Sequence, residues 1–268
     1  MVEHIAPVRL LYAQATGSPI RAMLALASQE GMISLAGGHP DPALLPADWL
    51  RDSLLDVAAG LNGTSLQYGA TEGLPALREA SARLLRQTGL AADADKVLIT
   101  TGSQQAIDLL GRVLVEPGEG IAVEPYNYPA ALQAFRFAGA KLVQVPADAQ
   151  GLDVDKLESI LIADKPRALY VVPNFANPTG AVMPLARRVR LLALAVQYDV
   201  TLIEDDPYGE LWFGQAPPPS LAQLNQQGGF CAQLAYMTSY SKVVAPALRL
   251  GVLLAPPDIL RAVVLAKQ

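Results

Sequence analysis

The lysine at position 242 is the side chain of this sequence best suited to react with a small molecule. It follows three residues that carry hydroxyl groups and precedes an apolar stretch, in the run Ser239-Tyr240-Ser241-Lys242-Val243-Val244. Burial among apolar groups lowers the pKa of a lysine, and the neutral amine can then form a Schiff base with a carbonyl compound. The alternative interpretation is a surface lysine, because most lysines are exposed to solvent.

A candidate phosphate site is encoded by Thr101-Gly102-Ser103-Gln104, where a predicted strand runs through a glycine into a predicted helix. The free N–H groups of a helix N-terminus attract anions, and the Ser103 hydroxyl adds a further donor. The same residues are also compatible with Ser103 acting only as a helix N-cap.

Three consecutive carboxylates, Glu204-Asp205-Asp206, follow an apolar run. Packing like charges together is unfavourable unless a cation or water compensates them. The run therefore indicates a solvated acidic turn, a metal site, or a site for a protonated ligand nitrogen. No histidine or second carboxylate pair stands out nearby, which disfavours the metal, and we predict no metal site.

Asn177 opens the turn Asn177-Pro178-Thr179-Gly180. Its amide either bonds the backbone of its own turn or donates to a ligand oxygen.

Short apolar runs that alternate with helical patterns must position these groups. Such alternation predicts an α/β fold, with a mostly parallel sheet of seven strands covered on both faces by helices. Ligands bind beyond the carboxyl ends of such strands, where the four segments above lie. The predicted strands are 97–101, 121–124, 142–145, 168–172, 200–204, 234–238 and 250–255. The predicted helices are 50–59, 75–87, 104–114, 130–138, 154–163, 185–197 and 258–266.

Two regions depart from this alternation. Residues 1–48 are rich in proline and glycine, which predicts an arm with one short helix near 20–28. The triple proline at 217–219 and the glutamine-rich stretch 223–233 predict a surface loop before the sixth strand.

Composition narrows the class of protein. Of 268 residues, 51% are hydrophobic and 17% charged, which excludes a disordered chain. A net charge of −5 argues against a nucleic-acid partner. The single cysteine excludes an intramolecular disulfide and a cysteine-based zinc site, so a cytoplasmic location is the expectation. Uncharged stretches are broken by Pro, Asn and Gly, so we predict no membrane span.

Together, a phosphate site, an amide donor, a carboxylate and a lysine match the needs of pyridoxal 5′-phosphate. This cofactor is held by its phosphate, by an imine to lysine, and by an acidic partner at the pyridine nitrogen.

The motifs that carry a family resemblance come in a fixed order along most of the chain. They are Gln67-Tyr68-Gly69, Gly73-Leu74-Pro75, Gly102-Ser103-Gln104-Gln105, Asn177-Pro178-Thr179-Gly180, Asp205-Asp206-Pro207-Tyr208, and Ser239-Tyr240-Ser241-Lys242 with Arg249 seven residues on. On these motifs the sequence resembles the fold-type I pyridoxal-phosphate aminotransferases of class I/II. It is most similar to the branch of 2-aminoadipate and kynurenine aminotransferases and the aminotransferase-like half of MocR regulators.

The resemblance implies a role for each matching residue. Lys242 would form the Schiff base and act as general base and acid, and Asp205 would face the ring nitrogen. Asn177 and Tyr208 would bond the phenolic oxygen, and Tyr128 would stack on the ring, with a core aromatic as the alternative. The phosphate would be held by Ser103, Gln104, Ser239 and Arg249, and by Tyr68 of a second subunit, which implies a homodimer with shared sites. Gly38 and Arg21 would lie at the substrate, with an exposed helix arginine as the alternative for Arg21.

The resemblance also implies a three-layer, aspartate aminotransferase-like large domain over 49–257, preceded by the arm. Residues 258–268 would begin the helix that leads to a small C-terminal domain, which we expect to be absent from this chain together with its carboxylate-binding arginine. The implied activity is transamination between an α-amino acid and a 2-oxo acid. The alternatives are a MocR-like effector domain, a lyase on the same fold, and a truncated fragment; the substrates stay open.

Overall fold

The computed structural model of the chain describes residues 12, 26, 29, 31–33 and 38–268. The chain divides into two units, Met1–Leu44 and Leu45–Gln268, and each is described by itself. In the first unit a short 3-10 helix, η1, covers Pro42–Leu44. The helix predicted near 20–28 lies, except for residue 26, outside the described residues.

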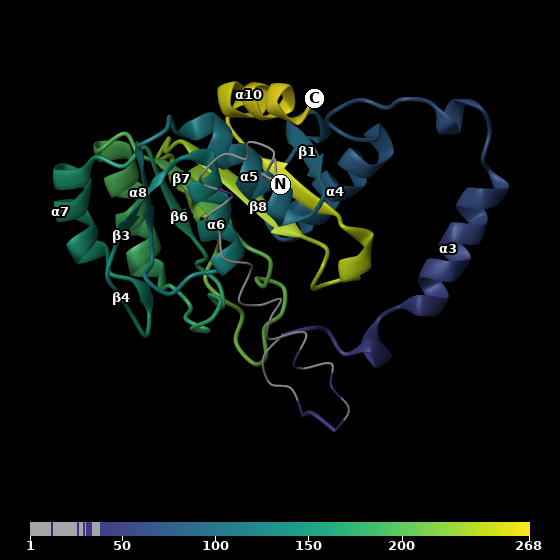
Figure 1. Cartoon of the computed structure of the whole chain (residues 1–268), viewed down its shortest axis with the longest axis horizontal. Helices are drawn as coiled ribbons and strands as arrows, with labels where there is room; N and C mark the ends of the chain where they lie inside the picture. The colour runs from purple at the N-terminus through teal and green to yellow at the C-terminus, as the bar shows by residue number, and fades with distance from the viewer. Residues whose placement is uncertain (1–11, 13–25, 27–28, 30, 34–37) are drawn as a thin grey trace, which may run out of the picture. The chain divides into compact units, whose positions relative to one another are not determined.

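The second unit contains a seven-stranded sheet in the order β1-β9-β8-β7-β6-β2-β3 (Figure 1). Its strands pair in parallel except β9, which is antiparallel to both β1 and β8. The predicted mostly parallel, seven-stranded sheet is therefore confirmed. The strands are β1 Val97–Thr100, β2 Gly120–Val123, β3 Lys141–Gln144, β6 Ala168–Val171, β7 Thr201–Asp205, β8 Leu234–Ser239 and β9 Gly251–Leu254.

Different helices cover the two faces of the sheet, because successive strand residues point to opposite sides. Tyr170, Ile203 and Met237 pack in one core with α5, α6 and α10, whereas Leu202 and Tyr236 pack in the other with α4, α7, α8 and α9. This arrangement confirms the three predicted layers. The helices are α4 Pro75–Gln87, α5 Ser103–Leu114, α6 Pro129–Ala138, α7 Val154–Asp164, α8 Leu185–Gln197, α9 Leu221–Gly228 and α10 Pro257–Lys267.

Helix α3, over Ala47–Ala59, buries none of its residues. Three further 3-10 helices are η2 Thr64–Leu66, η3 Ala94–Lys96 and η4 Pro246–Leu248. Within the part of the chain that the structure describes, no helix is both long and apolar enough to cross a membrane.

The surface loop predicted over 217–233 is wrong for its central part, where α9 forms. Ser220 and Gln223 begin this helix with a reciprocal pair of hydrogen bonds, at 3.1 and 2.6 Å. Leu221 and Ala222 are buried against the sheet. A glutamine-rich composition conceals the helix because only its first turn contributes to the core.

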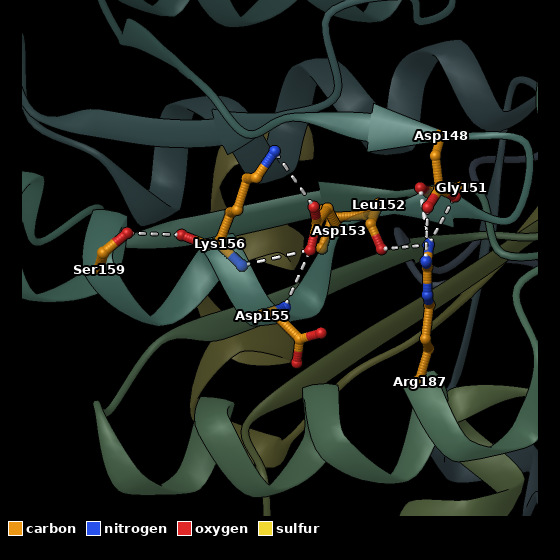
Figure 2. A network of polar contacts seen from close by, with 8 residues as sticks. All are labelled: Asp148, Gly151, Leu152, Asp153, Asp155, Lys156, Ser159 and Arg187. Atoms are coloured by element: carbon orange, nitrogen blue, oxygen red, sulfur yellow. Dashed lines mark hydrogen bonds and ion pairs between the residues drawn. The ribbon is translucent and has the colours of Figure 1, made fainter.

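A two-stranded hairpin, β4 Ala147–Asp148 and β5 Gly151–Leu152, is also absent from the predictions. Arg187 of α8 binds both carboxylate oxygens of Asp148, at 2.8 and 2.6 Å, and the two carbonyls of β5 at 3.1 and 3.2 Å (Figure 2). Beside it, Asp153 caps α7 by accepting two backbone N–H groups. Side-chain bonds thus hold a hairpin too short for a hydrophobic alternation to reveal.

Candidate active site

The carboxyl ends of the parallel strands meet at one edge of the sheet, and the polar segments follow those ends. Thr100 of β1 and Ser239 of β8 both pair with Gly251 of β9. Asp205, the last residue of β7, pairs with Met237 of β8. The tertiary structure therefore aligns the segment before α5, the segment of Lys242 and the carboxylate at the edge where such sheets bind ligands.

Asp205 is buried, and only one of its carboxylate oxygens is hydrogen-bonded. The Tyr170 hydroxyl donates to Oδ2 at 2.7 Å, while Oδ1 is buried without a partner among the described residues. Burial raises the pKa of Asp205 to about 7, against the lowering effect of the Tyr170 bond. Leaving a buried acceptor unpaired is costly. The geometry therefore suits a ligand that brings an N–H donor to Oδ1.

Glu204 and Asp206 serve other partners, so the acidic run is not one cluster. Glu204 accepts the first two backbone N–H groups of α9, at 2.7 and 2.8 Å, and burial raises its pKa to about 8. Asp206 accepts Asn174 Nδ2 at 3.0 Å and the Tyr236 hydroxyl at 3.4 Å. All three carboxylates are buried, so the solvated turn is wrong. Among the described residues, no three His, Cys, Asp or Glu side chains are placed so that they could hold a metal ion together.

Asn177 and Tyr208 form a second polar pair near Asp205. Burial raises the pKa of Tyr208, the nearby Asn177 side chain opposes that rise, and the charge of Asp205 adds to it. Tyr128, the residue before α6, is half-buried. Its pKa is raised by burial and by Asp205, and lowered by Arg249. The Asp205 carboxylate is therefore close enough to both phenols to raise their pKa values.

The start of α5 lies against Arg249. The helix begins at Ser103 with Gly102 as its N-cap, so the interpretation of Ser103 as the N-cap is wrong. Gly102 has φ +73°, and a β-carbon there would lie 2.8 Å from Arg249 Nη2. Nη2 also donates to the Thr101 carbonyl at 3.4 Å. A glycine is required where the guanidinium meets the free N–H groups of the helix, and this combination favours an anion.

Gln104 and Ser239 add polar groups at the same edge. Gln104 Nε2 donates to the Ala130 carbonyl at 3.2 Å, and its buried Oε1 has no partner among the described residues. Ser239 is buried, and its hydroxyl donates to the Ser241 hydroxyl at 2.9 Å and accepts the Ser241 N–H at 3.1 Å.

Lys242 lies in the turn that follows β8 and is half-buried. Burial lowers its pKa. In the described part of the chain, no ion pair or hydrogen bond is found for its Nζ atom, in contrast to Lys267, which donates to two carbonyls. An amine with a lowered pKa and no carboxylate partner is suited to act as a nucleophile or a base.

Three predicted site residues stay predictions. Tyr68 is fully exposed. Gly38 adopts φ +55° and belongs to the first unit, whose placement relative to the sheet is not defined. Arg21 lies outside the described residues.

Two residues that were not predicted to belong to the site form hydrogen bonds with carboxylates at this edge. Tyr170 holds Asp205, and Asn174 holds Asp206. A tyrosine inside the otherwise apolar strand 168–171 was a usable signal, because a buried hydroxyl needs a partner. No comparable signal marks Asn174, since an asparagine after a strand is also an ordinary turn residue.

Comparison with known proteins assigns the family. The profile of the family "Aminotransferase class I and II" matches residues 30–268. The chain belongs to this family. Among its aminotransferase relatives, the 2-aminoadipate transaminase of Thermus thermophilus is 40% identical over 251 residues, which cover 94% of this chain and 62% of the relative.

A solved aminotransferase and a regulator extend the comparison. The crystal structure of LysN, the α-aminoadipate aminotransferase of Thermus thermophilus in complex with N-(5′-phosphopyridoxyl)-L-leucine, has a TM-score of 0.88 and 38% identity, covering 97% of this chain and 64% of that one. An uncharacterized HTH-type transcriptional regulator of Bacillus subtilis is 32% identical over 92% of this chain and 50% of its own length. The chain thus spans less than two thirds of the length of these relatives.

Proposed function

We propose that this chain is the cofactor-binding part of a pyridoxal-phosphate-dependent transaminase, which moves an amino group between an α-amino acid and a 2-oxo acid. The observation that carries the proposal is the buried, unpartnered Oδ1 of Asp205, an acceptor suited to a protonated ring nitrogen. The LysN complex supports it, since its bound compound joins a phosphopyridoxyl group to an amino acid.

The residues present fit this cofactor. Asp205 would hold the ring nitrogen, Asn177 and Tyr208 the phenolic oxygen, and Tyr128 the face of the ring. The phosphate would be bound by Ser103, Gln104, Ser239 and Arg249. When bound, the cofactor supplies an electron sink for the charge that develops at the substrate α-carbon.

Each protein group then has a limited task. The negative charge of the Asp205 carboxylate would stabilise a proton on the ring nitrogen. Lys242 anchors the cofactor through Nζ and afterwards moves a proton at the same atom, as general base and then acid. Its lowered pKa makes the neutral amine accessible for both tasks.

The proposal extends to the parts of the protein around this edge. Residues 49–257 would form the large domain, with 1–48 as an arm and 258–268 as the start of the helix toward a small domain. Tyr68, whose side chain is fully exposed, would reach the phosphate site of a second copy in a cytoplasmic homodimer. Gly38 would line the substrate pocket, and Arg21 would contact the substrate side chain.

An effector domain of a transcription regulator is the second candidate, favoured by the HTH-type relative. Both candidates would bind the cofactor through the same residues. They differ in amino transfer: a transaminase converts bound pyridoxal phosphate to its amine form when an α-amino acid is added, and an effector domain need not.

The proposal is tested by labelling the lysine that carries the cofactor. The purified chain with added pyridoxal phosphate is expected to show a visible absorption band, and borohydride reduction followed by peptide mapping is expected to find the label on Lys242. Lys242→Ala should lose the band. Lys267→Ala is the matched control, because burial also lowers the pKa of Lys267, and it should keep the band. A label on another lysine would overturn the assignment.

A further inference from the structure

Two loops carry the groups proposed to bind the phenolic oxygen of the cofactor. The Asn177 loop, residues 172–184, connects β6 to α8, and the Tyr208 loop, residues 206–220, connects β7 to α9. Asn177 lies close enough to Tyr208 to lower its pKa. For the two side chains to bind one ligand oxygen, the two loops must keep a fixed relative position.

Packing alone does not hold the Tyr208 loop. The loop borders a cavity of about 260 Å³, which is also lined by Asn174 and Tyr236. Trp212 and Phe213, the large apolar side chains near its middle, are substantially exposed. Its triple proline offers carbonyls but no N–H groups, so another element must supply the donors.

Arg188 of α8 supplies them and is wholly buried. Toward the Asn177 loop it donates to the carbonyls of Met183, at 2.8 Å, and Pro173, at 3.0 Å. Toward the Tyr208 loop it donates to the carbonyls of Pro218, at 3.1 Å, and Pro219, at 3.0 Å. One guanidinium thus joins both loops.

A fifth hydrogen bond of Arg188 links it, through Asn174, to Asp206, the residue that follows β7. Arg188 Nη2 donates to Asn174 Oδ1 at 2.6 Å, and Asn174 Nδ2 donates to Asp206 Oδ1 at 3.0 Å. Asp206 directly follows Asp205, so the series of hydrogen bonds from Arg188 through Asn174 ends at the residue next in sequence to the carboxylate proposed to hold the ring nitrogen.

The chemistry of Arg188 argues for a positioning role. All five hydrogen bonds go to neutral acceptors, and none goes to a carboxylate. Burying the guanidinium carries a free-energy penalty that lowers the pKa of Arg188, and the charges of Glu204 and Asp206, which form no ion pair with it, offset that penalty only in part. An apolar side chain would avoid that penalty but could not join five acceptors in a fixed fork.

We propose that Arg188, acting through Asn174, is a positioning residue that sets the two loops so that Asn177 and Tyr208 address the same ligand oxygen. This inference rests on the proposed function. The side chain of Arg188 itself need not touch the cofactor or the substrate.

The test compares Asn174→Ala and Arg188→Lys with the unaltered chain and with Arg187→Met. Arg187 is the matched control, because it is the neighbouring arginine of α8, with carbonyl and carboxylate bonds to the hairpin instead of the loops (Figure 2). Three readouts are needed: thermal unfolding, the affinity for pyridoxal phosphate, and the pH midpoint of the visible absorption band.

We expect Asn174→Ala to weaken cofactor binding by about tenfold, the equivalent of one lost hydrogen bond, and to shift the pH midpoint of the band. Arg188→Lys, which keeps the charge and part of the donors, should show a smaller change of the same kind. Arg187→Met should lower only the unfolding temperature.

Folded Asn174→Ala and Arg188→Lys variants with the affinity and pH midpoint of the unaltered chain would overturn the positioning role. If Arg188→Lys does not fold, Asn174→Ala decides alone, since it leaves the guanidinium in place. An unaltered chain that shows no band and no label on Lys242 would instead contradict the proposed function.

Discussion

Arg187 and Arg188 are consecutive residues of α8 that bind two different regions of the molecule. Arg187 is paired with the Asp148 carboxylate, about half of which is exposed, and holds the hairpin β4–β5 (Figure 2). Arg188 is wholly buried, has no carboxylate partner among the described residues, and joins the Asn177 and Tyr208 loops. A turn of about 100° per residue sends the two side chains to different surroundings.

The difference in burial between the two arginines predicts how much their polar contacts contribute to stability. An exposed ion pair gains little free energy, because water competes for both charges. A wholly buried guanidinium binds acceptors, such as Asn174 Oδ1, that water reaches far less easily. We therefore expect equal chemical changes in the two regions to have unequal effects.

The largest contrast is expected between Asp205→Asn and Asp148→Asn. Loss of the Asp205 charge should slow the amino-acid-dependent conversion of bound pyridoxal phosphate by orders of magnitude, because the ring nitrogen would lose the group that keeps it protonated. Asp148→Asn should leave that rate unchanged. Single-turnover absorbance measures both, and an equal rate in the two variants would break the comparison.

The second contrast concerns stability. Arg188→Met should lower the free energy of unfolding by about 3–5 kcal/mol, since it leaves buried acceptors unpaired. Arg187→Met should lower it less, because two of its four hydrogen bonds go to the half-exposed Asp148 carboxylate, which water can solvate instead. Urea unfolding of the two variants is the measurement. A larger loss for Arg187→Met would mean that the hairpin, not the loops, depends more on its arginine.

A third contrast is the response to pH. The folded-state pKa values of Asp205 and Glu204 are raised to about 7 and about 8, so the folded chain binds more protons at these two groups than the unfolded chain does above about pH 4. Stability without cofactor should therefore be greatest at low pH within that window and fall as pH rises to about 8. Glu204→Gln should flatten this fall, as thermal unfolding between about pH 5 and 8.5 would show. Stability that rises over that range in the unaltered chain would contradict the raised pKa values.

The smallest effect is expected at the hairpin. The Arg187 bond holds the pKa of Asp148 at about 2, so its contribution should be lost only as pH falls from about 4 toward 2. Added salt should weaken this exposed pair slightly. Comparing Asp148→Asn with the unaltered chain in low and high salt measures the effect, and a loss that is independent of salt would show that the carbonyl bonds of Arg187 dominate.

Much of the architecture could be predicted from the sequence. Apolar runs such as 168–172 and 200–204 coincide with β6 and β7, because a strand buried on both faces must be apolar throughout. Helix α9 could not be predicted in this way, since a single buried turn leaves almost no periodic signal. The N-cap at Gly102 was also missed, because serine is the commoner N-cap by residue type and only the backbone conformation of Gly102 identifies it as the cap.

The candidate site also combines features that the sequence predicts with features that it does not. Local sequence by itself determined which chemical groups are available, such as Lys242 after one strand and Asp205 at the end of another, together with their order in the family motifs. The family resemblance selected Asp205 among the three carboxylates, and only the tertiary structure showed what the other two bind, since Glu204 caps a helix and Asp206 binds Asn174. The tertiary structure also decided that Arg188 joins two loops, because the carbonyls that it binds lie as far as 15 residues before it in one loop and 31 residues after it in the other. Such contacts depend on burial and on which side chain meets which carbonyl, and neither is encoded in the spacing of residue types.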